Sequence, residues 1–265
     1  MRKIVISNHK GGSGKTSIAL NLAFELSREG RKVLFLDIDP QADATARLGI
    51  LTYDSEKGEK IPTLYENLVR KWAPEKTIVH ARKNLDIIPG DLDLEGCEVG
   101  ELSNIPNRES LLSRRVVSKV KGYDYIIIDT PPSLGFMQLN ALVACDSVYV
   151  ALQTEYSAFR GIQKLFSKVE EIRDEINPSL SIKGILCTMF ARTKHHRAVI
   201  DLVKEKYPFL LFENVIPRTI CIANAGLQGK TVSEMYPDSK ATIAYGKLAA
   251  EFLAREEGEI ECLMK

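Results

Sequence analysis

The sequence predicts a single α/β domain, in which a mostly parallel, doubly wound sheet carries helices on both faces. Short apolar segments rich in β-branched residues alternate with segments of helical periodicity along the chain. A glycine-rich turn joins the first apolar segment to the first helix, the order of elements around a phosphate-binding loop. A length of 265 residues, with 45% hydrophobic and 27% charged residues, suits one large globular α/β domain or two small ones.

The composition sets limits on the class of protein. The formal net charge is +1, so a basic surface for a polyanion has to be local. The five cysteines form no C-x-x-C pair and are interpreted as reduced thiols, mostly in the core. The apolar run near the N-terminus is too short for a signal peptide, and no stretch approaches the ~20 apolar residues of a membrane span. We therefore expect a cytoplasmic protein.

The first strand is expected over residues 2–8 and the first helix over 15–29. Residues 8–17 between them read N-H-K-G-G-S-G-K-T-S. Three glycines allow backbone N–H groups to face a phosphate, Lys15 can reach the β- and γ-phosphates, and the Thr16 hydroxyl can hold Mg²⁺. A tight glycine turn without a ligand is the alternative. The Gly-Lys-Thr sequence at the start of a helix favours phosphate binding.

The loop departs from the usual pattern G-x-x-x-x-G-K-[ST], which needs a glycine where this chain has His9. Residues 10–16 read K-G-G-S-G-K-T, which resembles the deviant Walker A motif K-G-G-x-G-K-[ST] of the ParA/MinD family. The resemblance implies a phosphate-loop ATPase fold that uses ATP and Mg²⁺, with Lys10 crossing a dimer interface to the partner's nucleotide. It also implies catalytic roles for Lys10 and Lys15, and nucleotide contacts by Lys10, Gly11, Gly12, Ser13, Gly14, Lys15, Thr16 and Ser17.

The second strand, expected over 33–36, is an apolar run typical of a sheet covered on both faces. It ends in D-I-D-P-Q, where Asp37 and Asp39 share one face at the C-terminal end of the strand. The residues alone fit a ligand-binding pair and a pair of solvated turn carboxylates equally well. The motif is similar to the D-x-D-P-Q of ParA-like proteins. This implies that Asp39 orients or activates the attacking water and that Asp37 bonds to a water on Mg²⁺ or to switch backbone.

A third segment, residues 123–132, reads Y-D-Y-I-I-I-D-T-P-P and places Asp129 at the end of a buried strand. A Walker B aspartate that bonds to a water on Mg²⁺ and a helix cap both fit this position. The continuation D-T-P-P-S-L-G resembles the ParA switch that responds to the γ-phosphate. The resemblance thus implies a metal site formed by Thr16, Asp37 and Asp129.

Residues 50–120 carry no obvious chemical motif and are interpreted as scaffold and surface. We expect a surface loop at 51–62, a strand at 85–88, and helices at 63–71, 92–101 and 108–120. In the last third we expect strands at 147–152, 182–189 and 211–216, and helices at 159–177, 197–206 and 240–255.

Two further matches extend the resemblance toward the C-terminus. Residues 153–156 read Q-T-E-Y and resemble the family's Q-x-E-[YF] stretch. The family's adenine pocket falls on Ile216-Pro217-Arg218-Thr219. By this match Pro217 packs against the base, Thr219 supplies a polar contact where the family usually has Asn, and Met189 lines the same pocket.

A basic segment, residues 192–197, contains Arg192, Lys194 and Arg197 with two histidines between them. A solvated loop before a helix is the simplest interpretation of such a cluster. The resemblance implies DNA-binding residues in this part of the chain, with Arg192 matching best and Arg218 as a further candidate. One departure is Cys221, which stands where the family often has a second arginine.

Three functions compete on the sequence. A MinD-like positioning ATPase needs a C-terminal amphipathic helix with a basic face, yet residues 256–261 contain four glutamates. A reductase or metal chaperone related to the nitrogenase iron protein needs thiolates that hold a cluster, and the cysteines are better interpreted as buried thiols.

The motifs favour a ParA-type partition ATPase. We expect a homodimer formed on ATP binding, non-specific double-stranded DNA and a ParB-like DNA-binding protein as partners, no membrane, and a nucleoid-associated location in the cytoplasm. Because the chain begins directly at the first strand, we expect no N-terminal DNA-reading domain.

Overall fold

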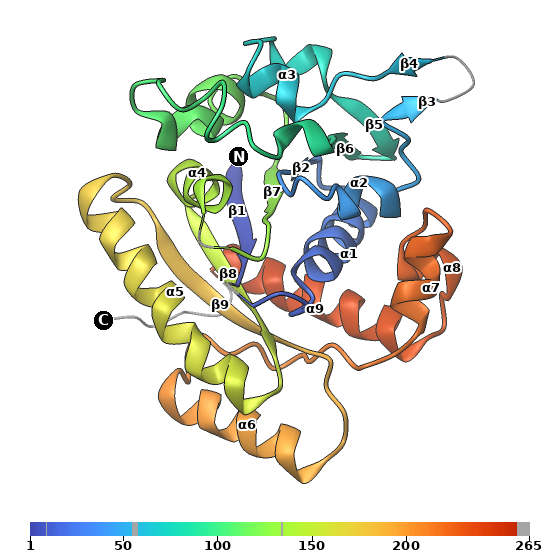
Figure 1. Cartoon of the computed structure of the whole chain (residues 1–265). Coiled ribbons are helices and arrows are strands. Elements are labelled where there is room, and N and C mark those ends of the chain that lie inside the picture. The colour runs from blue at the N-terminus through green and yellow to red at the C-terminus, as the bar shows by residue number, and fades with distance from the viewer. Residues whose placement is uncertain (9, 55–57, 134, 259–265) are drawn as a thin grey trace.

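A seven-stranded sheet forms the centre of the molecule (Figure 1), as seen in a computed structural model that describes residues 1–258 except 9, 55–57 and 134. Only β5 runs antiparallel to its neighbour, and the other pairings are parallel. The strands lie in the order β5 (Val79–Arg82), β6 (Leu85–Ile88), β2 (Val33–Asp37), β7 (Tyr125–Asp129), β1 (Arg2–Ser7), β8 (Ser147–Gln153) and β9 (Ser181–Thr188).

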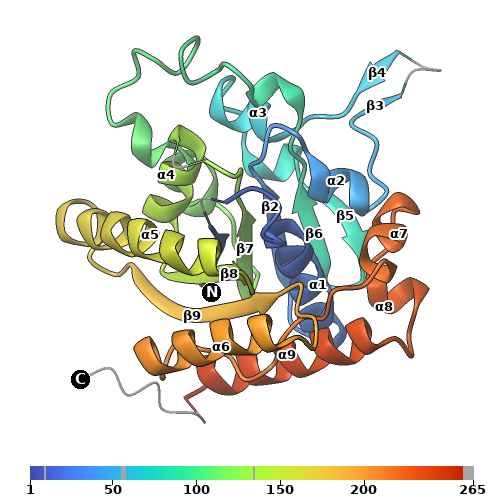
Figure 2. The same cartoon turned by 60° about the horizontal axis from the view of Figure 1, so that its bottom comes forward.

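Helices cover both faces of the sheet (Figures 1 and 2), which confirms the predicted doubly wound fold. On one face lie α1 (Lys15–Arg28) and α9 (Lys240–Glu256), and on the other lie α4 (Phe136–Ala144) and α5 (Tyr156–Glu175). Successive side chains of a strand point to opposite faces. Ile4 and Ile6 of β1 therefore join the core under α1, while Val5 joins the core under α4.

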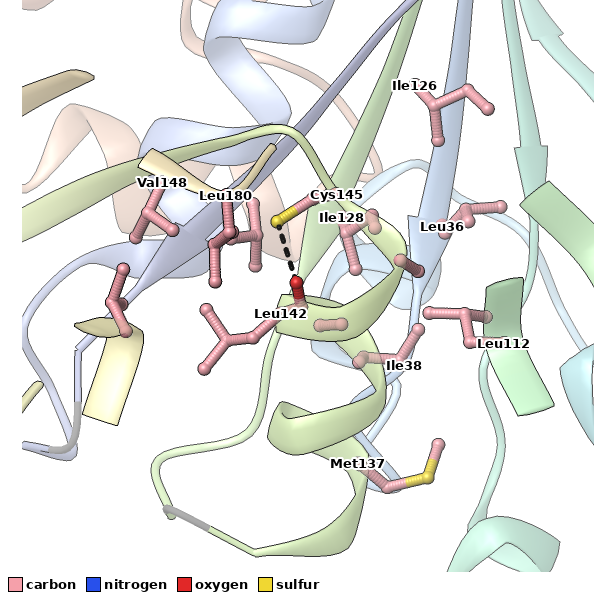
Figure 3. Packing of buried hydrophobic residues seen from close by; sticks show 14 of the residues in the cluster. Leu36, Ile38, Leu112, Ile126, Ile128, Met137, Leu142, Cys145, Val148 and Leu180 are labelled. Carbon is pink, nitrogen blue, oxygen red and sulfur yellow. Dashed lines mark hydrogen bonds between the residues drawn. The ribbon is translucent and has the colours of Figure 1, made fainter. Parts of the chain in front are cut away.

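The core under α4 shows why the strands lack polar interruptions. Figure 3 shows Leu36 and Ile128, from adjacent strands, facing Met137 and Leu142 of α4. Leu36, Ile128 and Leu142 are at most 1% exposed. A parallel sheet buried on both faces needs apolar side chains on both faces, and this is why the segments read as continuous Val, Ile and Leu.

The connections place the end of β1 at a reversal of strand order. The chain leaves β1 through α1, passes β7 and enters β2. It later leaves β7 through α4, passes β1 and enters β8. The two crossovers run in opposite directions. The loops that follow β1 and β7 therefore separate at the C-terminal ends of these strands, and the loop after β2 lies at the same end of the sheet. Ligands of open α/β sheets bind at such a switch point.

Several predicted elements are wrong in detail. The helix expected at 92–101 is only a 3₁₀ turn, η2 (Leu92–Leu94), because Gly96 has a positive φ of 79° that a helix does not accept. The helix expected at 108–120 consists of a 3₁₀ turn, η3 (Arg108–Ser110), and a π-helical turn, η4 (Ser113–Val117). The strand expected at 211–216 is reduced to isolated bridges from Leu211 to Ile185 and from Pro217 to Phe190.

Other elements differ in their bounds from the prediction or were not predicted at all. The helix expected at 63–71 spans α3 (Leu64–Leu68), and the loop expected at 51–62 contains the strand pair β3 (Tyr53–Asp54) and β4 (Glu59–Lys60). The helix expected from residue 197 is α6 (Lys194–Lys206), which begins earlier. Elements missed in the sequence are β5, η1 (Pro74–Lys76), α2 (Asp43–Arg47), α4, α7 (Cys221–Leu227) and α8 (Val232–Met235). Within the described ranges, no helix combines the length and apolar character needed to cross a bilayer.

Candidate nucleotide site

The glycine loop sits at the N-terminus of α1, at the switch point of the sheet. Gly12 and Gly14 have φ values of 69° and 84°, which only glycine adopts without strain. Gly14 precedes the helix directly, and a Cβ on it would lie 3.5 Å from the Thr188 side chain. The Thr188 hydroxyl donates to the Ser13 carbonyl at 2.8 Å. The first turn of a helix presents free N–H groups, so this arrangement suits an anion.

Lys15, the first residue of α1, is only 6% exposed. Burial lowers the pKa of the Lys15 ammonium, and the nearby carboxylates of Asp129 and Asp39 act in the opposite direction. A buried cation at the N-terminus of a helix attracts the negative charge of a phosphate. Lys15 is therefore close to Asp129 and Asp39 and lies at the end of the helix that suits a phosphate.

Asp37 and Asp129 are direct register partners at the ends of β2 and β7. The backbone N–H and hydroxyl of Thr45 donate to Asp37 Oδ2 at 2.8 and 2.7 Å, and the Asp39 N–H donates to Oδ1 at 3.3 Å. Neither side-chain oxygen of Asp129 forms a hydrogen bond of normal geometry with another described residue, although the Thr16 hydroxyl is close enough to lower its pKa. Buried polar atoms are normally paired, so the Asp129 carboxylate is left to a ligand.

The pKa shifts of Asp37 and Asp129 also indicate that a cation binds between them. Burial raises the pKa of Asp37 to about 6. Burial, with Asp37 beside it, raises the pKa of Asp129 well above its usual range, and the Thr16 hydroxyl and Lys15 oppose this. Two buried carboxylates side by side lower each other's charge unless a cation neutralises them.

The residues present fit Mg²⁺. A hydroxyl (Thr16) and two carboxylates (Asp37 and Asp129) are hard oxygen donors, which Mg²⁺ prefers. Across the described residues, no cluster of three or more His, Cys, Asp or Glu side chains could hold a metal by itself. Mg²⁺ usually takes only one or two protein carboxylates and completes its shell with phosphates and water. Because both Asp37 oxygens already accept hydrogen bonds, Asp37 suits contact through a water.

Asp39 lies beyond the end of β2 and is 9% exposed. Its Oδ1 accepts from the Gln41 N–H at 3.0 Å, and burial raises its pKa while Lys15 lowers it. The structure thus brings Asp39, Lys15 and Asp129 together, as the motifs predict. His9 and Leu134, which belong to the two flanking motifs, lie outside the described residues.

Lys10 pairs with Glu155 and not with the aspartates that follow β2 and β7. Its Nζ lies 2.9 Å from Glu155 Oε2 and donates to Ser157 Oγ at 3.3 Å, and its side chain is 33% exposed. Gly11 and Gly12 beside it are exposed. The Lys10 contacts join the loop to the start of α5.

A cavity of about 320 Å³ adjoins the loop on the side of α7 and α9. All three residues predicted for the adenine pocket line it: Met189, Pro217 and Thr219. Met189 has a φ of 52°, which is unusual for a non-glycine residue. The Thr219 hydroxyl accepts from the Cys221 N–H at 3.2 Å, so this side chain already has a local role.

Sequence reasoning missed five residues that line this cavity: Arg47, Thr188, Ile222, Ala223 and Tyr245. Tyr245 falls within the helix expected at 240–255, for which no site role was predicted. Arg47 gave no signal because α2 was not predicted.

The basic segment lies next to the cavity. Phe190 pairs with the segment around Pro217, its N–H donating to Ile216 and its carbonyl accepting from the Arg218 N–H, each at 3.0 Å. This pairing places Arg218 next to Phe190, two residues before the basic segment begins. Arg192, Lys194, Arg197 and Arg218 are exposed, and none forms an ion pair with another described residue.

Comparisons with known proteins agree with this geometry. The family model of the AAA domain matches residues 1–182. The chain is 40% identical over 254 residues to sporulation initiation inhibitor protein Soj of Bacillus subtilis, covering 95% of this chain and 98% of that protein. It is 38% identical over 258 residues to chromosome-partitioning ATPase Soj of Thermus thermophilus, covering 96% of each.

A solved structure shares the architecture. The crystal structure of cobyrinic acid a,c-diamide synthase from Mycobacterium smegmatis, with bound ADP and magnesium, superposes with a TM-score of 0.82 at 31% identity. The superposition covers 98% of this chain and 97% of that one.

Proposed function

The chain belongs to the ParA/MinD family of ATPases, and we propose that it is a partition ATPase. In this proposal, binding of ATP with Mg²⁺ drives formation of a homodimer, and the dimer binds double-stranded DNA without sequence preference. A ParB-like partner stimulates hydrolysis and so releases the DNA. The protein would then be found on the nucleoid.

The proposed roles follow from the positions of the side chains. Lys15 binds the β- and γ-phosphates, while Thr16 and Asp129 hold Mg²⁺ directly or through water. Asp37, held by Thr45, orients a water of that shell. Asp39, whose raised pKa makes it a better proton acceptor at neutral pH than an ordinary aspartate, positions the attacking water. When bound, Mg²⁺ supplies charge neutralisation at the phosphates.

The position of Lys10 is the observation that supports formation of a dimer. Its ammonium is partly exposed and held by Glu155 and Ser157 rather than by the Asp37 and Asp129 pair. A cation at the rim of a phosphate loop can reach the nucleotide of a facing copy. The same copy would double the surface offered to DNA.

The basic segment supports the DNA-binding step. Thr193 caps α6, its hydroxyl accepting from the His196 N–H at 3.2 Å, so Lys194 and Arg197 lie in the first turn. Cations are unfavourable at the positive end of a helix dipole. Arg192, Lys194 and Arg197 are exposed and close in sequence in a chain of nearly zero net charge, and such a local cluster of cations suits backbone phosphates.

The alternatives are less well supported. Cys97 and Cys145 are buried, and burial raises the pKa of both thiols, to about 11 for Cys97, which disfavours cluster ligation. A membrane-binding tail would begin at Glu256, yet this residue is buried and paired with Arg2 and Tyr149. Residues 259–265, to which the rest of that argument refers, lie outside the described part of the chain.

Asp39→Ala tests the proposal directly. The variant should bind ATP, fail to hydrolyse it, and accumulate an ATP-dependent dimer that binds random duplex DNA. Light scattering with and without ATP measures the mass, and fluorescence anisotropy of labelled DNA measures binding. If Asp39→Ala shows neither a mass increase nor DNA binding with ATP, the partition function is wrong. The parent protein with ADP serves as the control.

A further inference from the structure

The cavity beside the phosphate loop is lined by polar residues that the roles above leave unused. Its walls include the apolar side chains of Ile216, Pro217 and Ile222. Arg47 and Tyr245 bring an arginine guanidinium and a tyrosine hydroxyl to the same cavity. Apolar walls with a few fixed polar groups are typical of a site for a small organic ligand.

Tyr245 is an unpaired polar group in a buried position. It lies on α9, is 0% exposed, and its hydroxyl has no hydrogen-bond partner among the described residues. Its ring packs in the apolar core under α1. Native structures pair nearly all buried polar atoms, so an unpaired hydroxyl in a cavity wall marks a place where a ligand completes the bonding.

Arg47 defines the neighbouring part of the wall. Its Nη1 donates to Ser17 Oγ at 3.1 Å, and its side chain crosses Gly226, where a Cβ would lie 2.9 Å from Arg47 Cγ. The Arg47 charge is near enough to oppose the rise in the pKa of Tyr245 that burial causes. The Arg47 side chain is thus held between α1 and α7, beside Ser17 of the phosphate loop.

We propose that Tyr245 is a specificity-determining residue whose hydroxyl hydrogen-bonds to the base of the bound nucleotide, and that Arg47 positions Ser17 beside the phosphates. The inference rests on the proposed function, because it assumes that the cavity takes a nucleotide. Lys15 and Thr16 follow Gly14, which lines the cavity, and they already provide for the phosphates. A neutral hydroxyl that both donates and accepts suits the nitrogen atoms of a base edge.

Tyr245→Phe tests the hydroxyl alone, because the ring and its packing remain. Displacement of a fluorescent ATP analogue gives affinities for ATP and for Mg²⁺-tripolyphosphate, which has no base. We expect ATP affinity to fall about tenfold and tripolyphosphate affinity to stay unchanged. The melting temperature of the nucleotide-free protein should stay the same or rise, because the lost hydroxyl has no partner.

Two variants complete the design. Tyr149→Phe is the matched control, since Tyr149 is equally buried but does not line this cavity, and its hydroxyl donates to Glu256. It should lower the melting temperature and leave ATP affinity unchanged. Arg47→Met should weaken ATP and tripolyphosphate alike, because it acts through Ser17 at the phosphates.

Base recognition by Tyr245 is overturned if Tyr245→Phe binds ATP like the parent, or loses affinity equally for both ligands. If the parent protein itself binds neither ligand, the proposed function fails instead. The two failures are therefore distinguishable.

Discussion

Lys10 Nζ lies 2.9 Å from Glu155 Oε2, and this ion pair ties the lysine of the loop to the start of α5 in the same chain. The Lys10 ammonium lowers the pKa of the Glu155 carboxyl, as expected for a close pair. If Lys10 acts on the nucleotide of a facing copy, dimer formation has to break this contact. Glu155 therefore competes with the partner's nucleotide for Lys10.

Glu155→Gln should strengthen ATP-dependent dimerisation. The pair is partly exposed, so the gain is small, about two- to fivefold in the dimer dissociation constant. Analytical ultracentrifugation with a non-hydrolysable ATP analogue measures it, and Ser157→Ala is the control for the weaker contact. A weaker dimer in Glu155→Gln would mean that Glu155 itself contributes across the interface.

Lys15→Ala should abolish ATP binding. The substitution removes a buried cation at the phosphate end of the site and leaves Asp39 and Asp129 without their neutralising neighbour. Isothermal titration calorimetry with MgATP measures the loss. Lys10→Ala is the matched control, because it removes the other lysine of the loop and should retain ATP binding while weakening dimerisation and turnover. Unchanged affinity in Lys15→Ala would remove the basis for the phosphate site.

The chemistry of the site could be predicted from the sequence because its parts are local. Lys15, Asp37 and Asp129 each follow an apolar strand within a short motif, and parallel strands bring their C-terminal ends together. No comparable pattern in the sequence indicates a site role for Tyr245. Its proposed role depends on how α9 packs against α1. Sequence periodicity gives the face of a helix but not the cavity that the face lines.

The segment between β2 and β7 was predicted least well for a physical reason. Residues 92–120 combine positive φ values at Gly96 and Asn107 with short 3₁₀ and π turns, so neither a 3.6 nor a 2.0 periodicity extends over enough residues. The edge strand β5 was missed because it pairs on one side only and is half-exposed. These elements follow from tertiary packing rather than from local pattern.

Gly90→Ala should lower ATP turnover about tenfold or more. A Cβ on Gly90 would lie 2.8 Å from the Asp37 carbonyl and 3.0 Å from the Asp39 carbonyl, so the catalytic segment has to shift. Overpacking should also reduce stability by about 1–3 kcal/mol. Steady-state phosphate release and thermal denaturation measure the two effects.

Gly246→Ala is the control for Gly90→Ala. Gly246 lies within α9 with no atom within 4 Å of an added Cβ, so alanine should raise helix stability slightly and leave turnover unchanged. Normal turnover in Gly90→Ala would show that the carbonyls of Asp37 and Asp39 do not need their present positions.

Asp129→Asn should stabilise the metal-free protein at pH 8. Folding raises the pKa of Asp37 to about 6 and that of Asp129 well above its usual range, so the folded state holds protons that the unfolded chain has lost. Stability therefore falls as pH rises from about 4 through 6 and beyond. The amide removes one buried charge and should flatten this decline, with a gain of about 2–4 °C per kcal/mol at pH 8.

Calorimetric melting in EDTA across pH 4–9 measures the effect of Asp129→Asn. Asp201→Asn, at an exposed position on α6, is the control and should leave the pH profile unchanged. The same Asp129→Asn protein should lose Mg²⁺-dependent ATP hydrolysis. A lower melting temperature with an unchanged pH slope would contradict the assignment of Asp129 as a buried, raised-pKa carboxyl.

Arg192→Ala with Lys194→Ala should weaken ATP-dependent binding of random duplex DNA while ATP-driven dimerisation survives. The two cations are exposed and form no ion pair with a described carboxylate, so their removal should leave the fold intact. Each phosphate contact contributes about 0.9 to the slope of log affinity against log salt. A dimer loses four cations, so the slope should become shallower by about 2 to 4.

The matched control for the DNA patch is Lys32→Ala with Lys121→Ala, which also removes two exposed cations. These residues precede β2 and β7 and so lie at the N-terminal ends of the strands, whereas the basic segment follows the C-terminal end of β9. Because the net charge change is identical, a general electrostatic effect would weaken DNA binding equally in both double variants. Anisotropy titrations at several salt concentrations separate the two cases. Equal losses, or none in the Arg192 and Lys194 variant, would place the DNA surface elsewhere on the chain.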